Sequence, residues 1–198
     1  MFPLFETIRV EHGRVSNLTY HWARISHSCR EIFGCDPKFQ LDAILANEAV
    51  KYSGLHRLKF SYNPEQYQTE VAPYAVRAVE SLKLVVDNEI PYQHKFSDRS
   101  RLEALQRQRA QADDVLIVKN GLITDAAYAN IVFRAGYKWI TPAMPLLSGT
   151  MRQHLIDRGI IEAQRVEVGD LSTFESFKLI NAMLRFDFPE RPISAVIE

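Results

Sequence analysis

The stretch DDVLIVKNGLITDAAYANIVF, residues 113–133, contains the clearest fold signal in this sequence. Apolar runs lie on both sides of Asn120-Gly121, and an Asn-Gly pair between such runs is the strongest short-range signal for a β-hairpin. The next segment, NIVFRAGYKWITP at residues 130–142, predicts a second hairpin around Ala135-Gly136. Two consecutive hairpins therefore form the predicted centre of the fold.

Asp125 lies between these hairpins, among the small residues Ala126, Ala127 and Ala129. Small side chains allow a flat molecule to approach the backbone, and a carboxylate beside it could hold a protonated ring nitrogen. Aspartate also caps turns, because its carboxylate accepts hydrogen bonds from nearby backbone N–H groups. The residues alone leave both roles open for Asp125.

The rest of the chain predicts an α+β organisation in two parts. Apolar periodicity and turn residues predict a hairpin at 3–20, helices at 21–33 and 39–52, strands at 55–62, 67–74 and 81–88, helices at 99–112 and 148–160, and strands at 164–171 and 175–188. We predict an N-terminal domain at residues 1–87 and a C-terminal domain at 88–198. Clefts between domains are common places for small-molecule sites.

Composition excludes several classes of protein. Lys plus Arg and Asp plus Glu number 24 each, so the chain lacks the charge signature of a nucleic-acid or anionic-membrane partner. No window approaches 18 apolar residues, and the acidic N-terminal stretch is unlike a signal peptide, so we expect a cytoplasmic protein. Cys29 and Cys35 lack metal-ligand spacing, which predicts two reduced thiols and no metal site.

Three other features could carry chemistry, and each has an ordinary alternative. Lys95, within PYQHKFSDRSRLEAL at residues 91–105, is a nucleophile if its surroundings favour the neutral amine, and a solvated side chain otherwise. Residues 148–150, Ser-Gly-Thr, begin a predicted helix, where N–H groups and hydroxyls bind phosphate or form an N-cap. Arg24, on the first predicted helix, could hold a phosphate bidentately or remain a surface charge.

Together these parts match the needs of pyridoxal phosphate, which are a Schiff-base lysine, a carboxylate for the pyridine nitrogen, and an arginine and helix N-terminus for the phosphate. Their order resembles the class IV pyridoxal-phosphate enzymes, which include branched-chain and D-amino-acid aminotransferases and aminodeoxychorismate lyase. The segments that carry the resemblance are 4–25 (strand pair and arginine helix), 94–105 (cofactor lysine), 120–133 (carboxylate block), 146–156 (phosphate-binding loop and helix) and 178–189 (late strand and loop).

The resemblance implies an α+β or α/β fold of two small domains, the fold type IV of D-amino-acid aminotransferase, with the cofactor in the cleft between them. The cofactor-binding residues that it implies are Arg24, Lys95, Asp125, Gly149, Thr150, Asn181 and Ala182. Lys95 would be the catalytic residue that bonds the cofactor and moves a proton at the substrate α-carbon. A homodimer is also implied, because members of the family usually form one.

The segments resemble the lyase branch most, which implies elimination of pyruvate from 4-amino-4-deoxychorismate. The alternatives are an aminotransferase on D- or branched-chain amino acids and a non-catalytic relative that binds the cofactor. Arg99 and Arg185 could meet a substrate carboxylate or serve as structural or solvent-exposed arginines. Phe5 and Thr7 could line the substrate pocket from one face of the first strand, although core packing is the other role for Phe5.

Two features depart from the family pattern. The family usually has glutamate where this chain has Asp125, and aspartate is about one methylene shorter, so its contact to a ring nitrogen could be longer. The chain also begins almost at the FET strand, residues 5–7, and its first domain is shorter than usual. The second departure bears on the substrate pocket and the dimer contacts.

Overall fold

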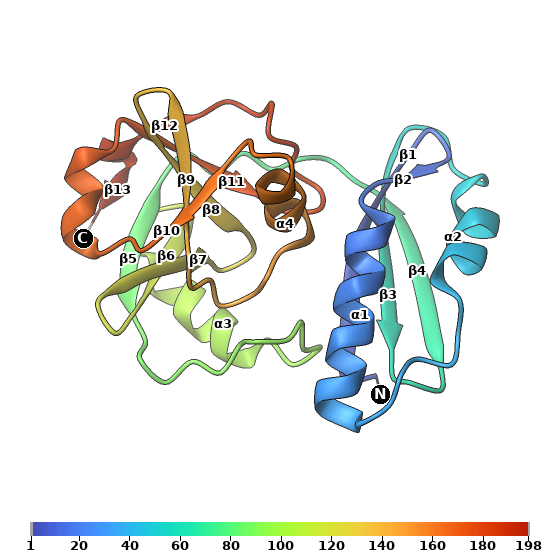
Figure 1. Cartoon of the computed structure of the whole chain (residues 1–198). Coiled ribbons are helices and arrows are strands. Elements are labelled where there is room, and N and C mark those ends of the chain that lie inside the picture. Colours follow the sequence, from blue (N-terminus) through green and yellow to red (C-terminus); the bar gives the residue numbers. More distant parts are fainter. Residues whose placement is uncertain (1, 198) are drawn as a thin grey trace. The chain divides into compact units, whose positions relative to one another are not determined.

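The computed structural model describes residues 2–197 (Figure 1). Its internal contacts divide the chain into two compact units. The N-unit comprises the chain through Val76 together with His94–Asp98, and the C-unit comprises Arg77–Gln93 together with the chain from Arg99 onward. Each unit has its own sheet and its own buried core.

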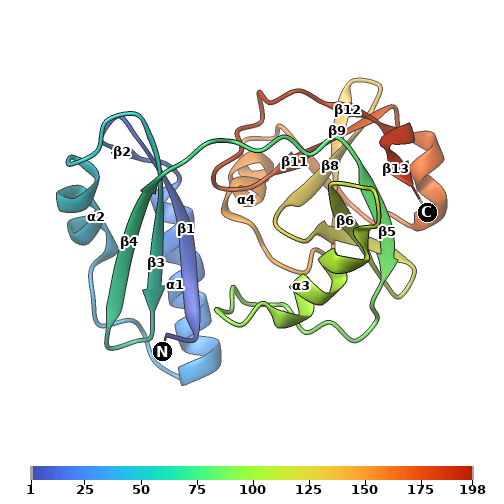
Figure 2. The same ribbon diagram turned by 180° about the vertical axis from the view of Figure 1, so that it is seen from behind.

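The N-unit is built on an antiparallel sheet whose strand order, among residues 2–197, is β2-β1-β3-β4. Its elements are β1 (Leu4–Glu11), β2 (Arg14–Val15), α1 (Leu18–Phe33), α2 (Leu41–Ala49), β3 (Leu55–Tyr62) and β4 (Tyr67–Pro73). Leu4, Ile8 and Val10 alternate along β1 and pack against Ile25 and Cys29 of α1. Viewed from the strand side, α1 lies behind the sheet (Figure 2).

The predicted first hairpin and first helix are confirmed. His12 and Gly13, between β1 and β2, both have positive φ, as a tight turn requires. Helix α1 ends at Gly34, which adopts φ 71° and donates its N–H to the Arg30 carbonyl at 3.0 Å. Helix α2 is shorter than predicted and ends at Ala49, five residues before Gly54.

The segment His94–Asp98 returns to the N-unit and lies along the edge of β1. Leu4 and Phe96 form an antiparallel bridge, the Phe5 N–H donates to the Lys95 carbonyl at 3.1 Å, and the Ser97 N–H donates to the Pro3 carbonyl at 2.8 Å. These bonds place Lys95 in the N-unit, whereas the sequence predicted it in the C-terminal domain. The division therefore differs from the predicted boundary at 87/88.

Residues 77–87 also differ from the prediction, because they belong to the C-unit. Within them β5 (Leu82–Val86) pairs in parallel with β6 (Asp114–Lys119), a partner in the second half of the chain. The remaining C-unit strands are β7 (Leu122–Ala126), β8 (Asn130–Ala135), β9 (Lys138–Pro142), β10 (Glu162–Gln164), β11 (Ser176–Ile180), β12 (Arg191–Pro192) and β13 (Val196–Ile197).

The two central hairpins of the C-unit are confirmed. Asn120 and Gly121 have φ of 52° and 77°, the left-handed pair that a two-residue hairpin needs. Strand β8 then runs antiparallel to β7, β9 and β11. Its Ile131 and Phe133 enter one core, while Val132 packs on the other side against Met151 of α4 (Thr150–Asp157).

Three predicted elements of the C-unit are wrong in part. Helix α3 (Ser100–Gln106) continues as a 3₁₀ turn, Arg107–Arg109, and stops at Ala110, whose φ is 52°. Of the predicted strand at 164–171, only Gln164 belongs to a strand, β10, and the second half belongs to a 3₁₀ helix, Val168–Thr173, begun by reciprocal bonds between Glu167 and Asp170. Strand β11 ends at Ile180 rather than continuing to 188. A further 3₁₀ turn, Ile193–Ala195, precedes β13.

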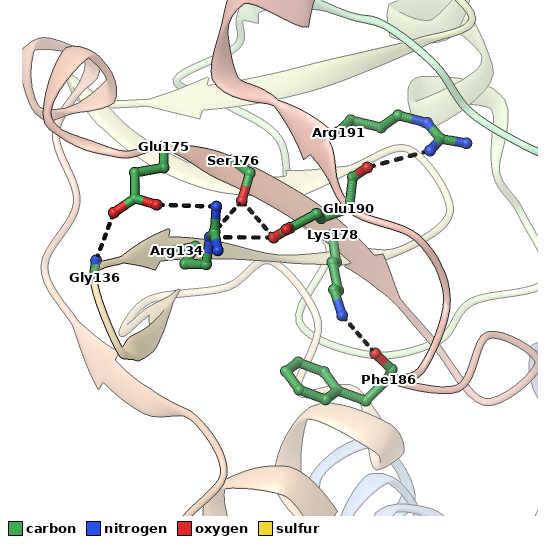
Figure 3. Close-up of polar contacts among 8 residues, drawn as sticks. All are labelled: Arg134, Gly136, Glu175, Ser176, Lys178, Phe186, Glu190 and Arg191. Atoms are coloured by element: carbon green, nitrogen blue, oxygen red, sulfur yellow. Dashed lines mark hydrogen bonds and ion pairs between the residues drawn. The ribbon is translucent and has the colours of Figure 1, made fainter.

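Polar contacts of β8 and of the segments that flank β11 hold β11 in place (Figure 3). Arg134 of β8 pairs with Glu175 at 2.9 Å and with Glu190 at 3.3 Å, and the Ser176 hydroxyl donates to Glu190 at 2.7 Å. Lys178 donates to the Phe186 carbonyl at 3.0 Å, which ties the loop after β11 back to its own strand. The last of these bonds anchors the loop that contains Asn181 and Ala182.

Candidate functional site

The predicted site residues fall into two groups, one in each unit. The N-unit holds Phe5, Thr7, Arg24 and Lys95, and the C-unit holds Arg99, Asp125, Gly149, Thr150, Asn181, Ala182 and Arg185. Among residues 2–197, no cluster of His, Cys, Asp or Glu has the arrangement of a metal site, and no helix is long and apolar enough to cross a membrane.

Arg24 pairs with Glu6, a residue that the sequence had not indicated. Glu6 lies on β1 in the row of alternating residues that faces the helices, and its side chain is completely buried. The Arg24 Nε donates to Glu6 Oε1 at 2.8 Å, and Nη2 donates to Oε2. His21, one helical turn before Arg24, is bonded through Nδ1 to Oε2 at 2.7 Å.

Charge balance explains how Glu6 is tolerated in the core. Burial alone would raise the pKa of Glu6, but the Arg24 guanidinium and the hydrogen bonds from His21 and Arg24 outweigh it and hold the pKa at about 2. Burial lowers the pKa of His21 despite its bond to Glu6, and the charges of Arg24 and Lys95 lower it further. Glu6 is therefore ionised and His21 neutral near pH 7.

Lys95 lies beside β1, and its side chain is half-buried. Its Nζ stands 4.7 Å from the centroid of the Phe5 ring, on the face of β1 opposite to Glu6. Phe5 is 8% exposed, and Thr7 shares its face with greater exposure. Lys95, Phe5 and Thr7 are thus brought together on one side of the N-unit sheet.

Asp125 is the centre of the C-unit group. It is the penultimate residue of strand β7, is 5% exposed, and each of its carboxylate oxygens accepts a hydrogen bond. Asn130 Nδ2 donates to Oδ1 at 2.7 Å, and the Leu147 N–H donates to Oδ2 at 2.9 Å. Among residues 2–197, no lysine or arginine forms an ion pair with Asp125.

Because no lysine or arginine among residues 2–197 forms an ion pair with Asp125, burial dominates the pKa of its carboxyl group. Burial raises the pKa of Asp125 to about 6, and the bonds from Leu147 and Asn130, with the charge of nearby Arg152, offset this only in part. Arg152 is 5% exposed and donates instead to the Pro142 carbonyl at 2.8 Å. Asp125 is therefore a fixed, buried carboxylate whose charge is weakly compensated.

Gly149 and Thr150 form the N-terminus of α4, as predicted. A Cβ on Gly149 would lie 1.8 Å from Asn130 Oδ1, so the close approach of Asn130 requires glycine there. Thr150 is 4% exposed, and its buried Oγ1 has no hydrogen-bond partner among residues 2–197. Asn130 also donates to the Leu147 carbonyl at 2.9 Å, so one side chain joins Asp125 to this loop.

The other predicted C-unit residues hold loops in place. Asn181 accepts the N–H groups of Met183 and Leu184 at 2.8 and 2.9 Å and donates to the Tyr128 carbonyl at 3.1 Å. Arg99 donates to the Ala127 carbonyl at 2.7 Å, and its guanidinium stacks 4.2 Å from the Tyr128 ring centroid. Ala182 is half-buried beside Asn181, and Arg185 is exposed.

Four polar residues of these groups were missed by the sequence reasoning, namely Glu6, His21, Asn130 and Arg152. Glu6 was detectable, because it interrupts the otherwise apolar row formed by Leu4, Ile8 and Val10. His21 precedes Arg24 by three residues, a spacing that puts both on one helix face. Asn130 and Arg152 carry no comparable signal, since the loop carbonyl groups to which they donate, those of Leu147 and Pro142, lie 17 and 10 residues away.

The arrangement matches a known family. The sequence profile of the family described as amino-transferase class IV matches residues 3–186. An uncharacterised protein of Haemophilus influenzae is 36% identical over 185 residues, which make up 92% of this chain and 98% of that protein. The chain belongs to the class IV aminotransferase family, as the sequence resemblance predicted.

Solved structures show the same fold. A protein of Haemophilus somnus 129PT, provisionally named 4-amino-4-deoxychorismate lyase, is similar with a TM-score of 0.90 and 34% identity, over 94% of this chain and 98% of that chain. A hypothetical aminotransferase of Mycobacterium tuberculosis, solved with pyridoxal phosphate bound, gives a TM-score of 0.77 at 18% identity, over 93% of this chain and 78% of that one. The predicted fold type IV is confirmed.

Proposed function

We propose that this chain is a pyridoxal-phosphate-dependent enzyme that acts on an amino acid or a related amine through Lys95. The observation that carries this proposal is Asp125, a buried carboxylate held by Asn130 and Leu147 without an ion-pair partner among residues 2–197. Such a group favours a cation as its next neighbour. The protonated pyridine nitrogen of the cofactor is a cation of that kind.

The N-terminus of α4 fits the phosphate of the same cofactor. Thr150 has a buried hydroxyl without a partner in the described chain, and the positive end of a helix dipole at its N-terminus favours an anion. Gly149 keeps the approach to these groups open, because any side chain there would collide with Asn130. We assign Arg24, Gly149 and Thr150 to the phosphate, with the backbone at Asn181 and Ala182 assisting.

When bound, pyridoxal phosphate supplies an electron sink that stabilises negative charge at the carbon next to the substrate nitrogen. Lys95 would hold the cofactor covalently and, once released, would move a proton at that carbon as general acid and base. Asp125 would keep the proton on the ring nitrogen. Phe5 and Thr7, which share the sheet face with Lys95, would border the substrate.

For the reaction we propose elimination of pyruvate from 4-amino-4-deoxychorismate. The support is the name and the 34% identity of the Haemophilus somnus protein over 94% of this chain. Amino transfer from D- or branched-chain amino acids is the second candidate, favoured by the family description itself. A relative that binds the cofactor without turnover is the third. Arg99 and Arg185 are the proposed contacts for a substrate carboxylate.

The first test is an absorbance spectrum of the protein mixed with pyridoxal phosphate. A visible band of lysine-bound cofactor is expected in the parent protein and absent in Lys95→Ala. Lys59→Ala is the matched control, because Lys59 also stands over the Phe5 ring, with Nζ 6.0 Å from its centroid. A band that survives in Lys95→Ala, or is absent from the parent, would reject the proposal.

The same holoenzyme distinguishes the reactions. Pyruvate release from 4-amino-4-deoxychorismate without an added keto acid indicates the lyase, keto-acid-dependent loss of an amino-acid amine indicates the aminotransferase, and neither indicates the non-catalytic relative. We also propose that the enzyme is a homodimer, which is usual for the class. Sedimentation of the holoenzyme tests this, and a monomeric mass would contradict it.

A further inference from the structure

Glu6 stands out in the N-unit as a carboxylate in a row of core residues. Leu4, Ile8 and Val10, its neighbours on that face of β1, are all fully buried and apolar. A buried carboxylate is costly unless cations and hydrogen bonds compensate it. The packing of the core therefore does not explain why a charged residue occupies this position.

The contacts of Glu6 converge on Arg24. Nε and Nη2 of Arg24 bind the two different oxygens of Glu6, an arrangement that fixes the plane of the guanidinium as well as its position. The Glu6 side chain has no exposed surface, while the Arg24 side chain keeps 12%. The carboxylate thus binds the Nε and Nη2 edge of the guanidinium, on a side chain that is not completely buried.

His21 fixes the carboxylate in turn. An ionised carboxylate can only accept, so Nδ1 of the neutral His21 carries the proton and donates it to Glu6 Oε2. His21 is itself fully buried, on the turn of α1 that precedes Arg24. Helix α1 therefore supplies both donors, and strand β1 supplies the acceptor between them.

We propose that Glu6, held by His21, is a positioning residue that fixes the Arg24 guanidinium in the orientation that receives the cofactor phosphate. This inference rests on the proposed function, because it takes the phosphate as the ligand of Arg24. Glu6 neutralises part of the Arg24 charge, so its benefit is orientation. An arginine that is already immobilised loses less conformational entropy when it binds an anion.

The test compares two probes that differ by the phosphate alone, pyridoxal phosphate and pyridoxal. Dissociation constants are measured from the Lys95-dependent absorbance band for the parent and for Glu6→Gln, which keeps the size but not the two acceptors. Pyridoxal phosphate binding is expected to weaken about tenfold to hundredfold, the effect of one lost charge-assisted hydrogen bond. Pyridoxal binding is expected to stay the same.

The matched control is Glu11→Gln on the same strand. Glu11 also pairs with an arginine, Arg9, at 3.0 Å, and it has no place in the proposed site. The ratio of the two affinities, for pyridoxal and for pyridoxal phosphate, is expected to be the same in the Glu11→Gln variant as in the parent. In an Arg24→Met background, Glu6→Gln is expected to produce no further change in the ratio, because the two residues act as one unit.

A measurement on the parent protein covers the case in which Glu6→Gln does not fold. Inorganic phosphate is titrated into ¹⁵N-histidine-labelled protein, and the His21 Nδ1 resonance is followed after assignment by its loss in His21→Asn. Phosphate bound to Arg24 is expected to shift this resonance saturably through the shared Glu6 carboxylate. A resonance that does not move would overturn the inference.

The outcomes separate the inference from the proposed function. A parent protein without the Lys95-dependent band rejects the function and the inference together. A parent with the band, combined with a Glu6→Gln variant whose affinities for both probes fall equally or not at all, rejects the inference alone. A loss confined to pyridoxal phosphate supports both.

Discussion

Glu6 in the N-unit and Asp125 in the C-unit are both buried carboxylates, 0% and 5% exposed, yet they differ in acidity. The pKa of Glu6 lies at about 2 and that of Asp125 at about 6, although burial acts in the same direction on both. Glu6 accepts hydrogen bonds from the charged Arg24 guanidinium, whereas Asp125 accepts them from two neutral amide groups. A cation in direct contact outweighs burial, and two amide donors do not.

The difference separates two kinds of buried carboxylate. The charge of Glu6 is already compensated within its own unit by the Arg24 guanidinium, which it holds in place. Asp125 is oriented by Asn130 and Leu147 but is left weakly compensated, which suits a residue whose cation arrives with a ligand. Three experiments test how far this contrast holds.

Removal of the Arg24 guanidinium should abolish the difference between Glu6 and Asp125, and it should have the largest effect on stability of the three experiments. Arg24→Met leaves Glu6 buried without its main partner, and the free energy of unfolding at pH 7 is expected to fall by about 3–5 kcal/mol. Urea unfolding measures it. Arg30→Met, which breaks the exposed Arg30–Asp36 pair on the same helix, is the control and should cost less than about 1 kcal/mol. Equal losses in the two variants would contradict the role of Arg24.

The pH dependence of the free energy of unfolding should also distinguish the two carboxylates, because folding shifts their pKa values in opposite directions. The pKa of Asp125 rises from 3.8 to about 6 on folding, so its contribution is full below 3.8 and is lost as pH rises towards 6. As pH rises between these values, the free energy of unfolding of Asp125→Asn should therefore increase by about 3 kcal/mol relative to that of the parent. Urea unfolding across this range measures the gain.

Glu6→Gln is the comparison for that series. The pKa of Glu6 falls from 4.5 to about 2 on folding, so its contribution is present above 4.5 and is lost as pH falls towards 2. Relative to the parent, the free energy of unfolding of this variant should fall as pH rises from about 2 to 4.5. Two variants with profiles of the same sign would show that Asp125 and Glu6 do not differ as described.

The smallest of the three effects concerns the support of Asp125. Gly149→Ala places a Cβ against Asn130 Oδ1, and Asn130 cannot move without losing its bonds to Asp125 and the Leu147 carbonyl. A loss of about 1–3 kcal/mol in the free energy of unfolding is expected, as for other overpacked sites. Gly169→Ala, where no heavy atom lies within 4 Å, is the control. Equal stability of the two variants would show that Asn130 is not held as described.

Local signals in the sequence predicted the elements that depend on local geometry. Asn120-Gly121 predicted a hairpin because those residues reach positive φ with little strain, and Gly34 predicted the end of α1 for the same reason. The strand predicted at 164–171 failed because the bonds between Glu167 and Asp170 favour a 3₁₀ turn over an extended chain. The family resemblance singled out Lys95, Asp125 and Arg24, and their functional roles remain predictions.

By itself, the sequence determined the hairpins, most of the helices, the family and the residues with candidate chemistry, because each depends on short spacings or on ordered motifs. The tertiary structure alone decided that Lys95 joins the N-unit through the edge of β1, and that Glu6 meets Arg24 across 18 residues of chain. It also decided that Asn130 closes on Gly149. These contacts join segments that are distant in sequence, and the pairing of strands and the packing of a helix on a sheet bring them together.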